Sequence, residues 1–390
     1  MLRDLDPSYF ALVMATGIVS RAMRLAGARP LSDALLVVGL ASFVVMSAAY
    51  ALRLALYHRE FAADARDPRR AFGFFTFGAA AGVLAAPLAA SGDVAAAAVL
   101  LSLALAGWLL PSYAVPMLVG GEEELRPPLA GANGTWFVWV VGTQAVAVAA
   151  TAFPPPVPSA LAALGICCWV IGVVLYLVVA VLVVTARLEF PLRPTDSTAP
   201  YWVFMGATAI SVLAGSQILR LPDDAFAQAV HAVVSGLSVM LWAFGTWLIP
   251  LLVALGVWRH LLCHVSLRYE PALWAVVFPV GMYGVASREL GTVLRVSWLV
   301  TLGRYEAWLA LATWAAVAAV MAAALHRRQG PPSPGPAGGE YAAGPPADLP
   351  VTFREVFAVS HAGAPVPRSG TEWRGLCLSA IASSSRRLIS

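Results

Sequence analysis

Residues Pro271 to Arg288 read PALWAVVFPVGMYGVASR, an apolar run close to the roughly 20 residues that cross a bilayer core. Between Ala272 and Ser287 it carries no charge, and Phe278 stands directly before Pro279. A proline inside a helix removes one backbone hydrogen bond and bends the axis. We therefore interpret Phe278 as a side chain pushed inward at a bend, in the plugged wall of a pore. For this segment alone, a lipid-facing or packed Phe-Pro pair is the alternative.

The composition of the whole chain predicts an integral membrane protein. Of its 390 residues, 60% are hydrophobic and 12% are charged, and the mean hydropathy is +0.78. Soluble domains carry about 25% charged residues, so that class is excluded. The chain offers ten apolar runs of spanning length, which predict ten transmembrane helices. The expected spans are about 8 to 28, 33 to 56, 70 to 90, 94 to 118, 132 to 153, 158 to 186, 200 to 219, 226 to 257, 271 to 288 and 304 to 325.

The basic residues, all of them arginine, predict the orientation in the membrane. With the amino terminus inside, thirteen arginines fall on cytoplasmic segments and seven on the opposite face. The positive-inside rule then places both termini in the cytoplasm and the protein in the cytoplasmic membrane. Residues 1–326 are expected to form the transmembrane domain. Residues 327–390 begin with a Pro/Gly-rich tract and are expected to be a mostly disordered cytoplasmic tail.

The odd-numbered spans carry an internal repeat. An aromatic residue stands near the start of each one, at spacings of 63, 64, 65 and 73 residues: Tyr9, Phe72, Trp136, Tyr201 and Trp274. In three copies a threonine follows the aromatic residue by seven positions. Repeats with the same orientation share an axis along the membrane normal. We expect an all-α fold of five quasi-repeated helical hairpins around a central pore, with odd helices inside and even helices outside.

The odd spans predict a pathway without formal charge. They contain no ionisable residue at mid-membrane depth, where proton-coupled carriers usually place relays. Threonine hydroxyls, glycine backbone and aromatic rings would line it, with arginines at both mouths to attract anions. The candidate pore-lining residues are Thr16, Gly17, Thr76, Gly78, Gly142, Thr143, Gly206, Thr208 and Gly281. The alternative is a packed bundle in which glycines allow close helix contact and threonines bond to their own helix carbonyls.

Other chemistry has little support in the sequence. His260, Cys263 and His264 have helical spacing, and we interpret them as a polar helix end beside Arg259 rather than as a metal site. We find no phosphate-binding loop, paired acidic motif or nucleophile turn. We therefore expect no enzyme activity, cofactor or metal. The basic linker at 57–70 favours anionic lipid headgroups over nucleic acid as its partner.

Four segments together carry a family resemblance: PSYFALVMATGIVS, NGTWFVWVVGTQ, YWVFMGATAISVLAG and LWAVVFPVGMYG. Residues 5–325 resemble the tellurite-resistance/dicarboxylate transporter family, which includes TehA-like bacterial channels and the slow-type (SLAC1-like) channels of plant guard cells. The resemblance implies ten helices in five hairpins, a pore in each protomer and a homotrimer. It also implies that Phe278, before Pro279, closes the pore. This chain departs from the pattern because its other inner helices mostly lack a central proline, so Gly17, Gly142 and Gly206 would have to supply any bends.

The expected function is therefore passive transport of a small anion through a pore gated by Phe278. The family resemblance covers chloride, nitrate, sulfite and C4-dicarboxylates such as malate, and no residue chooses among them. A proton-coupled carrier for a C4-dicarboxylate or sulfite is the alternative. A membrane enzyme using His260, Cys263 and His264 is a more distant one.

Overall fold

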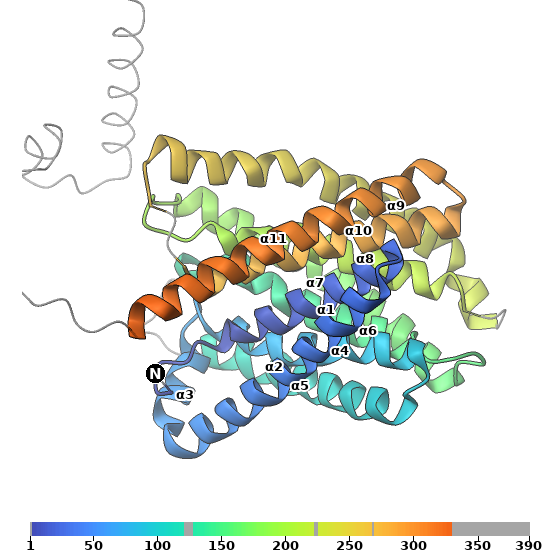
Figure 1. The fold of residues 1–390 in the computed structure, drawn as a ribbon, viewed down its shortest axis with the longest axis horizontal. Coiled ribbons are helices and arrows are strands. Elements are labelled where there is room, and N and C mark those ends of the chain that lie inside the picture. Colours follow the sequence, from blue (N-terminus) through green and yellow to red (C-terminus); the bar gives the residue numbers. More distant parts are fainter. Residues whose placement is uncertain (1, 121–127, 222–224, 267–268, 330–390) are drawn as a thin grey trace, which may run out of the picture. The chain divides into compact units, whose positions relative to one another are not determined.

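The computed structural model describes residues 2–120, 128–221, 225–266 and 269–329, and within these ranges the regular structure is entirely helical (Figure 1). Residues up to Arg328 form one compact unit. The predicted tail lies outside the described residues from position 330 onward. An all-α fold is confirmed, because long apolar helices satisfy their backbone hydrogen bonds internally, as a membrane interior demands.

Inner and outer helices alternate along the chain. The inner helices are α1 (Ala11–Ala26), α4 (Phe75–Ser91), α6 (Phe137–Ala150), α8 (Trp202–Ile218) and α10 (Trp274–Leu294). The outer helices are α2 (Arg29–Leu56), α5 (Val94–Gly120), α7 (Ser159–Glu189), α9 (Ala225–Val257) and α11 (Ser297–Gln329). Shorter elements are α3 (His58–Arg66), the 3₁₀ turn η4 (Pro128–Gly131) and the π-helical turn η7 (Trp258–Leu262).

Every inner helix of the described chain begins with a 3₁₀ turn. These turns are η1 (Pro7–Phe10), η2 (Ala71–Phe74), η5 (Gly134–Trp136), η6 (Ala199–Tyr201) and η8 (Pro271–Leu273). Each turn contacts the next, and η8 contacts η1, so the five starts form a closed ring at one end of the unit, called here the turn end. The helices close in the same order, from α1 through α4, α6, α8 and α10 back to α1. The repeat in the sequence is thus a repeat in space, with parallel inner helices around one axis.

Burial separates the two layers as predicted. In α1, α4 and α8, taken with their 3₁₀ turns, 67 to 83% of the most apolar stretch is buried. In the outer helices the corresponding share is 6 to 44%. The exposed outer side chains are large and apolar, as lipid contact requires, and include Val37, Leu110, Val181, Trp247 and Trp308.

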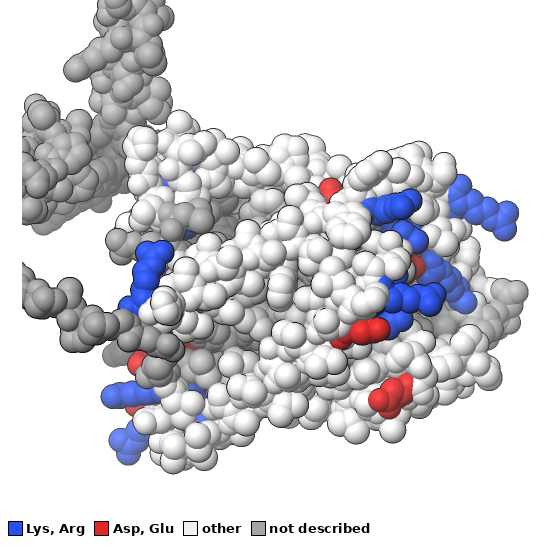
Figure 2. Space-filling view, viewed as in Figure 1, with Lys and Arg blue, Asp and Glu red and all other residues white. Residues whose placement is uncertain are grey.

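Length and composition qualify eight helices of the described chain as membrane spans, and the predicted total of ten stays a prediction. The stretch Gly134–Ala150 is apolar but shorter than the eight. On the face shown in Figure 2, a broad and almost uncharged belt separates charged groups at the two ends of the unit. The chain is therefore a multi-pass membrane protein.

The last inner hairpin is more tightly joined than predicted. The expected loop between positions 288 and 304 is a two-residue connection, because α10 runs to Leu294 and α11 begins at Ser297. Arg295 makes the turn with a left-handed backbone, φ 58°. Hydropathy placed the end of the ninth span at its first charged residue, Arg288, but the helix α10 continues past this residue. As a result Glu289 lies within α10, and Arg304 lies within α11 instead of in a loop.

Three hairpins are closed at the turn end by the same interaction. Arg53 in the last turn of α2 donates from Nε to the Arg3 carbonyl at 3.1 Å, just before η1. Arg187 in the last turn of α7 donates to the Ala132 carbonyl at 2.9 Å, just before η5. Arg259 in η7 donates to the Pro194 carbonyl at 3.4 Å, upstream of η6. Each guanidinium thus bonds a loop carbonyl ahead of its own hairpin.

The first of these arginines belongs to a larger charged network at the turn end. Arg53 Nη2 also lies 2.6 Å from Asp64 of α3, and both side chains are buried. Asp64 binds Arg70 at 2.6 Å, and Arg70 reaches Asp6 at 3.3 Å. The basic linker at 57–70 therefore contains a helix, and ion pairs join this linker to the start of the chain. In Figure 1, α3 lies beside the amino terminus.

Candidate functional site

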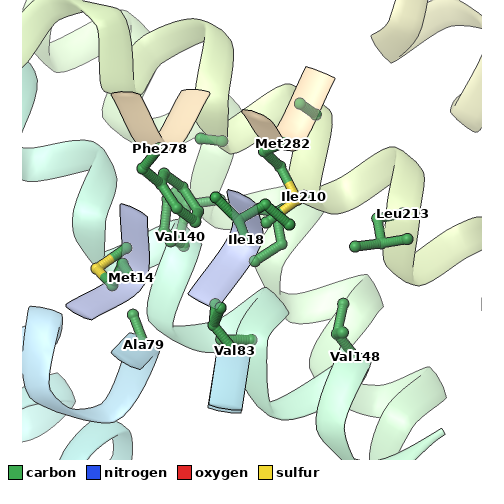
Figure 3. Close-up of a cluster of buried hydrophobic side chains, with 14 of the residues drawn as sticks. Met14, Ile18, Ala79, Val83, Val140, Val148, Ile210, Leu213, Phe278 and Met282 are labelled. Atoms are coloured by element: carbon green, nitrogen blue, oxygen red, sulfur yellow. The ribbon is translucent and has the colours of Figure 1, made fainter. Parts of the chain in front are cut away.

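Phe278 lies in the interior of the helix ring. Its side chain is 1% exposed, and it stands near the start of α10 directly before Pro279. Figure 3 shows it in a cluster of buried apolar side chains drawn from every inner helix. The labelled members of the cluster are Met14, Ile18, Ala79, Val83, Val140, Val148, Ile210, Leu213, Phe278 and Met282. Phe278 therefore packs among apolar side chains of all five inner helices, and its gate role stays a prediction.

The candidate glycines mark close helix contacts. A Cβ on Gly206 would lie 2.8 Å from Pro279 Cγ, and one on Gly17 would lie 3.0 Å from Val83 Cγ1. Gly281 faces Ile18 in the same way, at 3.1 Å. These contacts join inner helices to one another, so the glycines set the width of the ring.

The other two candidate glycines differ from this pattern. Gly78 faces the outer helix α5, where a Cβ would lie 2.8 Å from the Gly107 backbone. Gly142 has its nearest neighbour, the Phe75 carbonyl oxygen, at 3.6 Å, which is ordinary contact. Substitution is therefore tolerated best at Gly142.

The candidate threonines all donate to backbone carbonyls. Thr16 donates to the Leu12 carbonyl at 2.8 Å, Thr143 to the Trp139 carbonyl at 2.9 Å and Thr208 to the Met205 carbonyl at 2.6 Å. Thr76 bonds both its own helix start and the Pro7 carbonyl of η1, the latter at 2.9 Å.

Two of these hydroxyls also face outer helices. Trp314 of α11 donates from Nε1 to Thr16 Oγ1 at 3.0 Å, and Thr208 Oγ1 lies against Gly245 of α9. All four threonine hydroxyls therefore donate to carbonyls at or near their own helix, as one of the two alternatives from the sequence expected. Their lining role stays a prediction.

A cavity of about 420 Å³ opens at the end of the ring opposite the turn end. Every inner helix contributes to its wall through its last two turns or the residues that follow, by Arg21, Pro87, Thr151, Gln217 and Glu289. Because all five hairpins supply a side chain, the cavity lies on the axis of the ring. We call it the vestibule.

The vestibule is positively charged. The charged residues in its described wall are three arginines, Arg21, Arg24 and Arg220, and one carboxylate, Glu289. Arg24 is paired outside the wall with Asp33, at 2.7 Å, and both are exposed. Charged groups gather at this end in Figure 2, where α1 ends. A concave, apolar-walled site with excess arginine concentrates anions from solution.

Glu289 bridges two arginines across the vestibule. Its Oε1 lies 3.7 Å from Arg21 Nη2, and its Oε2 contacts Arg220 Nη1. Gln217 completes the group. The amide orientation that satisfies both of its polar atoms turns the oxygen toward Arg21, where it accepts from Nη2 at 3.2 Å, and the nitrogen then donates to the Val148 carbonyl at 3.2 Å. Sequence reasoning assigned the arginines to a pore mouth and overlooked Glu289 and Gln217. The only signals were a polar residue near the end of the predicted seventh span, Gln217, and one directly after the predicted ninth span, Glu289.

The histidine-cysteine cluster occupies a helix end. His260 lies in η7, and its Nδ1 is 2.8 Å from the Val265 carbonyl oxygen. His264 has a left-handed backbone, φ 52°. No group of three metal-ligating side chains occurs in the described ranges.

Together the ring, its apolar interior and the arginine-lined vestibule define the class of protein: a multi-pass helical membrane protein with a positively charged cavity at one end of its helix ring. Residues 4–322 match the family described as voltage-dependent anion channel (SLAC1), and the chain belongs to this family. Membership confirms the resemblance seen in the sequence and implies anion transport across a membrane.

Relatives are membrane proteins as well. An uncharacterized membrane protein of Mycobacterium tuberculosis, matched in two strains, is 51% identical over 140 residues, which are 36% of this chain and 71% of the relative. An uncharacterized transporter of Methanocaldococcus jannaschii is 23% identical over 326 residues, which are 81% of this chain and 92% of the relative.

Proposed function

We propose that this protein conducts small anions passively through its ring of inner helices, with Phe278 as the gate. The observation that carries the proposal is the order of the environments along the axis of the helix ring. A positively charged vestibule formed by all five hairpins leads toward an apolar cluster that contains Phe278. Arginines draw anions to the opening, and the benzyl ring excludes them until it moves.

The gate needs no charge to work. Removing an ion from water costs several kcal/mol even after the protein relaxes, so a dry apolar constriction is an effective barrier. The proline ring of Pro279 packs beside Gly206 of α8, which leaves the helix start that bears Phe278 close to a small residue. Displacement of the benzyl ring of Phe278 would open the path without moving a helix.

The proposal includes the setting of the protein. We place it in the cytoplasmic membrane with the turn end and both termini in the cytoplasm, which the thirteen-to-seven arginine bias favours. Assembly as a homotrimer follows from the family resemblance. Chloride, nitrate and C4-dicarboxylates such as malate are the candidate substrates.

Purified protein in liposomes tests passive conduction. With a nitrate gradient and a potassium ionophore to balance charge, we expect nitrate to equilibrate across the membrane at the same rate with or without a pH gradient. Protein-free liposomes give the background leak. Accumulation of nitrate or malate above the external concentration, driven by a pH gradient, would contradict a passive channel.

One observation favours the alternative of proton coupling. Glu306 is half-buried within α11, and its Cβ lies against Gly284 of α10. An ionisable side chain inside a membrane helix is a candidate proton carrier. For a passive channel, Glu306→Gln leaves anion flux unchanged. If the substitution abolishes pH-driven uptake of malate that the native protein performs, the coupled mechanism replaces the passive one.

A further inference from the structure

The Glu289 carboxylate lies between two arginines of the vestibule, in the position that a bound anion would take. Its two carboxylate oxygens face different guanidinium groups, Arg21 from α1 and Arg220 from the residues after α8. The Glu289 side chain is 9% exposed and that of Arg21 is 17% exposed, while Arg220 is 41% exposed. Arg220 is thus accessible from solvent, while Arg21 is largely buried in the vestibule wall.

Glu289 leaves its two arginines incompletely neutralised. It does not simply neutralise a neighbour, because a single carboxylate serves two arginines and the described wall keeps an excess of positive charge. Arg24 is already satisfied by Asp33. Arg21 is held additionally by the neutral Gln217. The arginine pair therefore has capacity for one more negative group.

We propose that the vestibule contains a binding site for a small oxyanion, formed by Arg21, Arg220 and Gln217, in which Glu289 is a built-in competitor. An arriving carboxylate with two oxygens can make the contacts that Glu289 makes now. To bind fully, it must displace the Glu289 side chain or share the arginines with it. The resident carboxylate weakens anion binding and so allows release.

The cavity is large enough for this exchange. A volume of about 420 Å³ exceeds the volume of a small carboxylate such as acetate several times over, so Glu289 and the ligand fit together during displacement. The use of the site in transport rests on the proposed function. Anion binding itself does not.

Binding of acetate to the detergent-purified full chain, measured by calorimetric titration, tests the proposal. Glu289→Gln keeps the shape of the side chain and removes its charge, and we expect the Kd for acetate to fall at least tenfold. Arg220→Gln removes the accessible arginine, and we expect acetate affinity to drop at least tenfold below that of the native protein.

Asp93→Asn is the matched control. Asp93 lies at the same end of the unit, before α5, and is exposed outside the vestibule wall. The substitution changes net charge as Glu289→Gln does, and asparagine caps a helix as well as aspartate. We expect it to leave the Kd within twofold of the native value. An equal gain in affinity from Asp93→Asn, or no gain from Glu289→Gln, overturns the proposal.

Two further outcomes are decisive. If Glu289→Gln does not fold, unchanged acetate affinity in Arg220→Gln overturns the binding site by itself. Suppose instead that all three variants bind acetate as expected, but liposomes that contain the native protein conduct no anion. The proposed function then fails, while the binding site stands.

Discussion

Replacing Phe278 with alanine separates the effect of a gate from that of ordinary core packing. The side chain is 1% exposed, and truncating a buried phenylalanine costs about 3–5 kcal/mol of stability. The same truncation removes the apolar plug from the ring interior. We expect anion flux to rise at least tenfold, since this requires only about 1.4 kcal/mol off the barrier. That is a small part of the several kcal/mol that desolvation of one ion costs.

The assay is nitrate efflux from proteoliposomes with matched amounts of folded protein, and Phe137→Ala is the control. Phe137 is as deeply buried as Phe278, but it packs between layers, with its ring 4.3 Å from that of Phe204 and 5.6 Å from that of Tyr176 of α7. Both variants lose similar stability. Only Phe278→Ala is expected to conduct faster.

The direction of the change makes the experiment decisive. Loss of stability by itself lowers flux, so a rise in flux against a loss of stability comes from an opened path. If Phe278→Ala is folded and conducts at the native rate, or if Phe137→Ala conducts equally fast, Phe278 is a packing residue and the passage lies elsewhere.

Two other substitutions test the architecture around this path. Arg53→Ala removes one of the two arginines that lie 2.6 Å from the buried Asp64 carboxylate and leaves Arg70 as the other, so we expect a loss of about 2 kcal/mol in the free energy of unfolding; a loss below about 0.5 kcal/mol would show that Arg53 is dispensable. Gly206→Ala places a Cβ 2.8 Å from the proline ring of α10 and should destabilise the protein by about 1–3 kcal/mol. Gly256→Ala in α9, with no atom within 4 Å, should be neutral or stabilising by up to about 1 kcal/mol. Equal effects of the two glycine substitutions would contradict close packing of α8 on α10.

The hairpin repeat could be predicted from the sequence because a membrane restricts the positions at which each residue type can lie. Aromatic residues spaced by 63 to 65 positions predicted the odd spans as copies of one unit, and the structure starts each copy with a 3₁₀ turn. The inner helices are rich in small residues, and the outer helices are rich in branched apolar residues. Both follow from the local demand for close helix packing or for lipid contact.

The ends of the helices were less predictable. Hydropathy measures the cost of placing a residue in lipid, so it ended the ninth span at Arg288. A charged residue in the last two turns of a helix can reach water or a partner, and α10 continues past Arg288 to Leu294. The helix α3 was missed for a similar reason. Its charged residues are typical of a solvated linker, and the sequence does not show that Asp64 forms ion pairs with Arg53 and Arg70.

The sequence alone therefore determined the class of the protein, its alternating layers and the identity of the residue that we propose as gate. Those properties depend on one residue type at a time, or on regular spacing along one helix. Only the tertiary structure decided where the threonine hydroxyls bond and which glycines touch a neighbouring helix. It also brought Arg21, Gln217 and Glu289 into one vestibule from three helices that are far apart in the chain. Contacts of this kind depend on how the hairpins close into a ring, which no local pattern encodes.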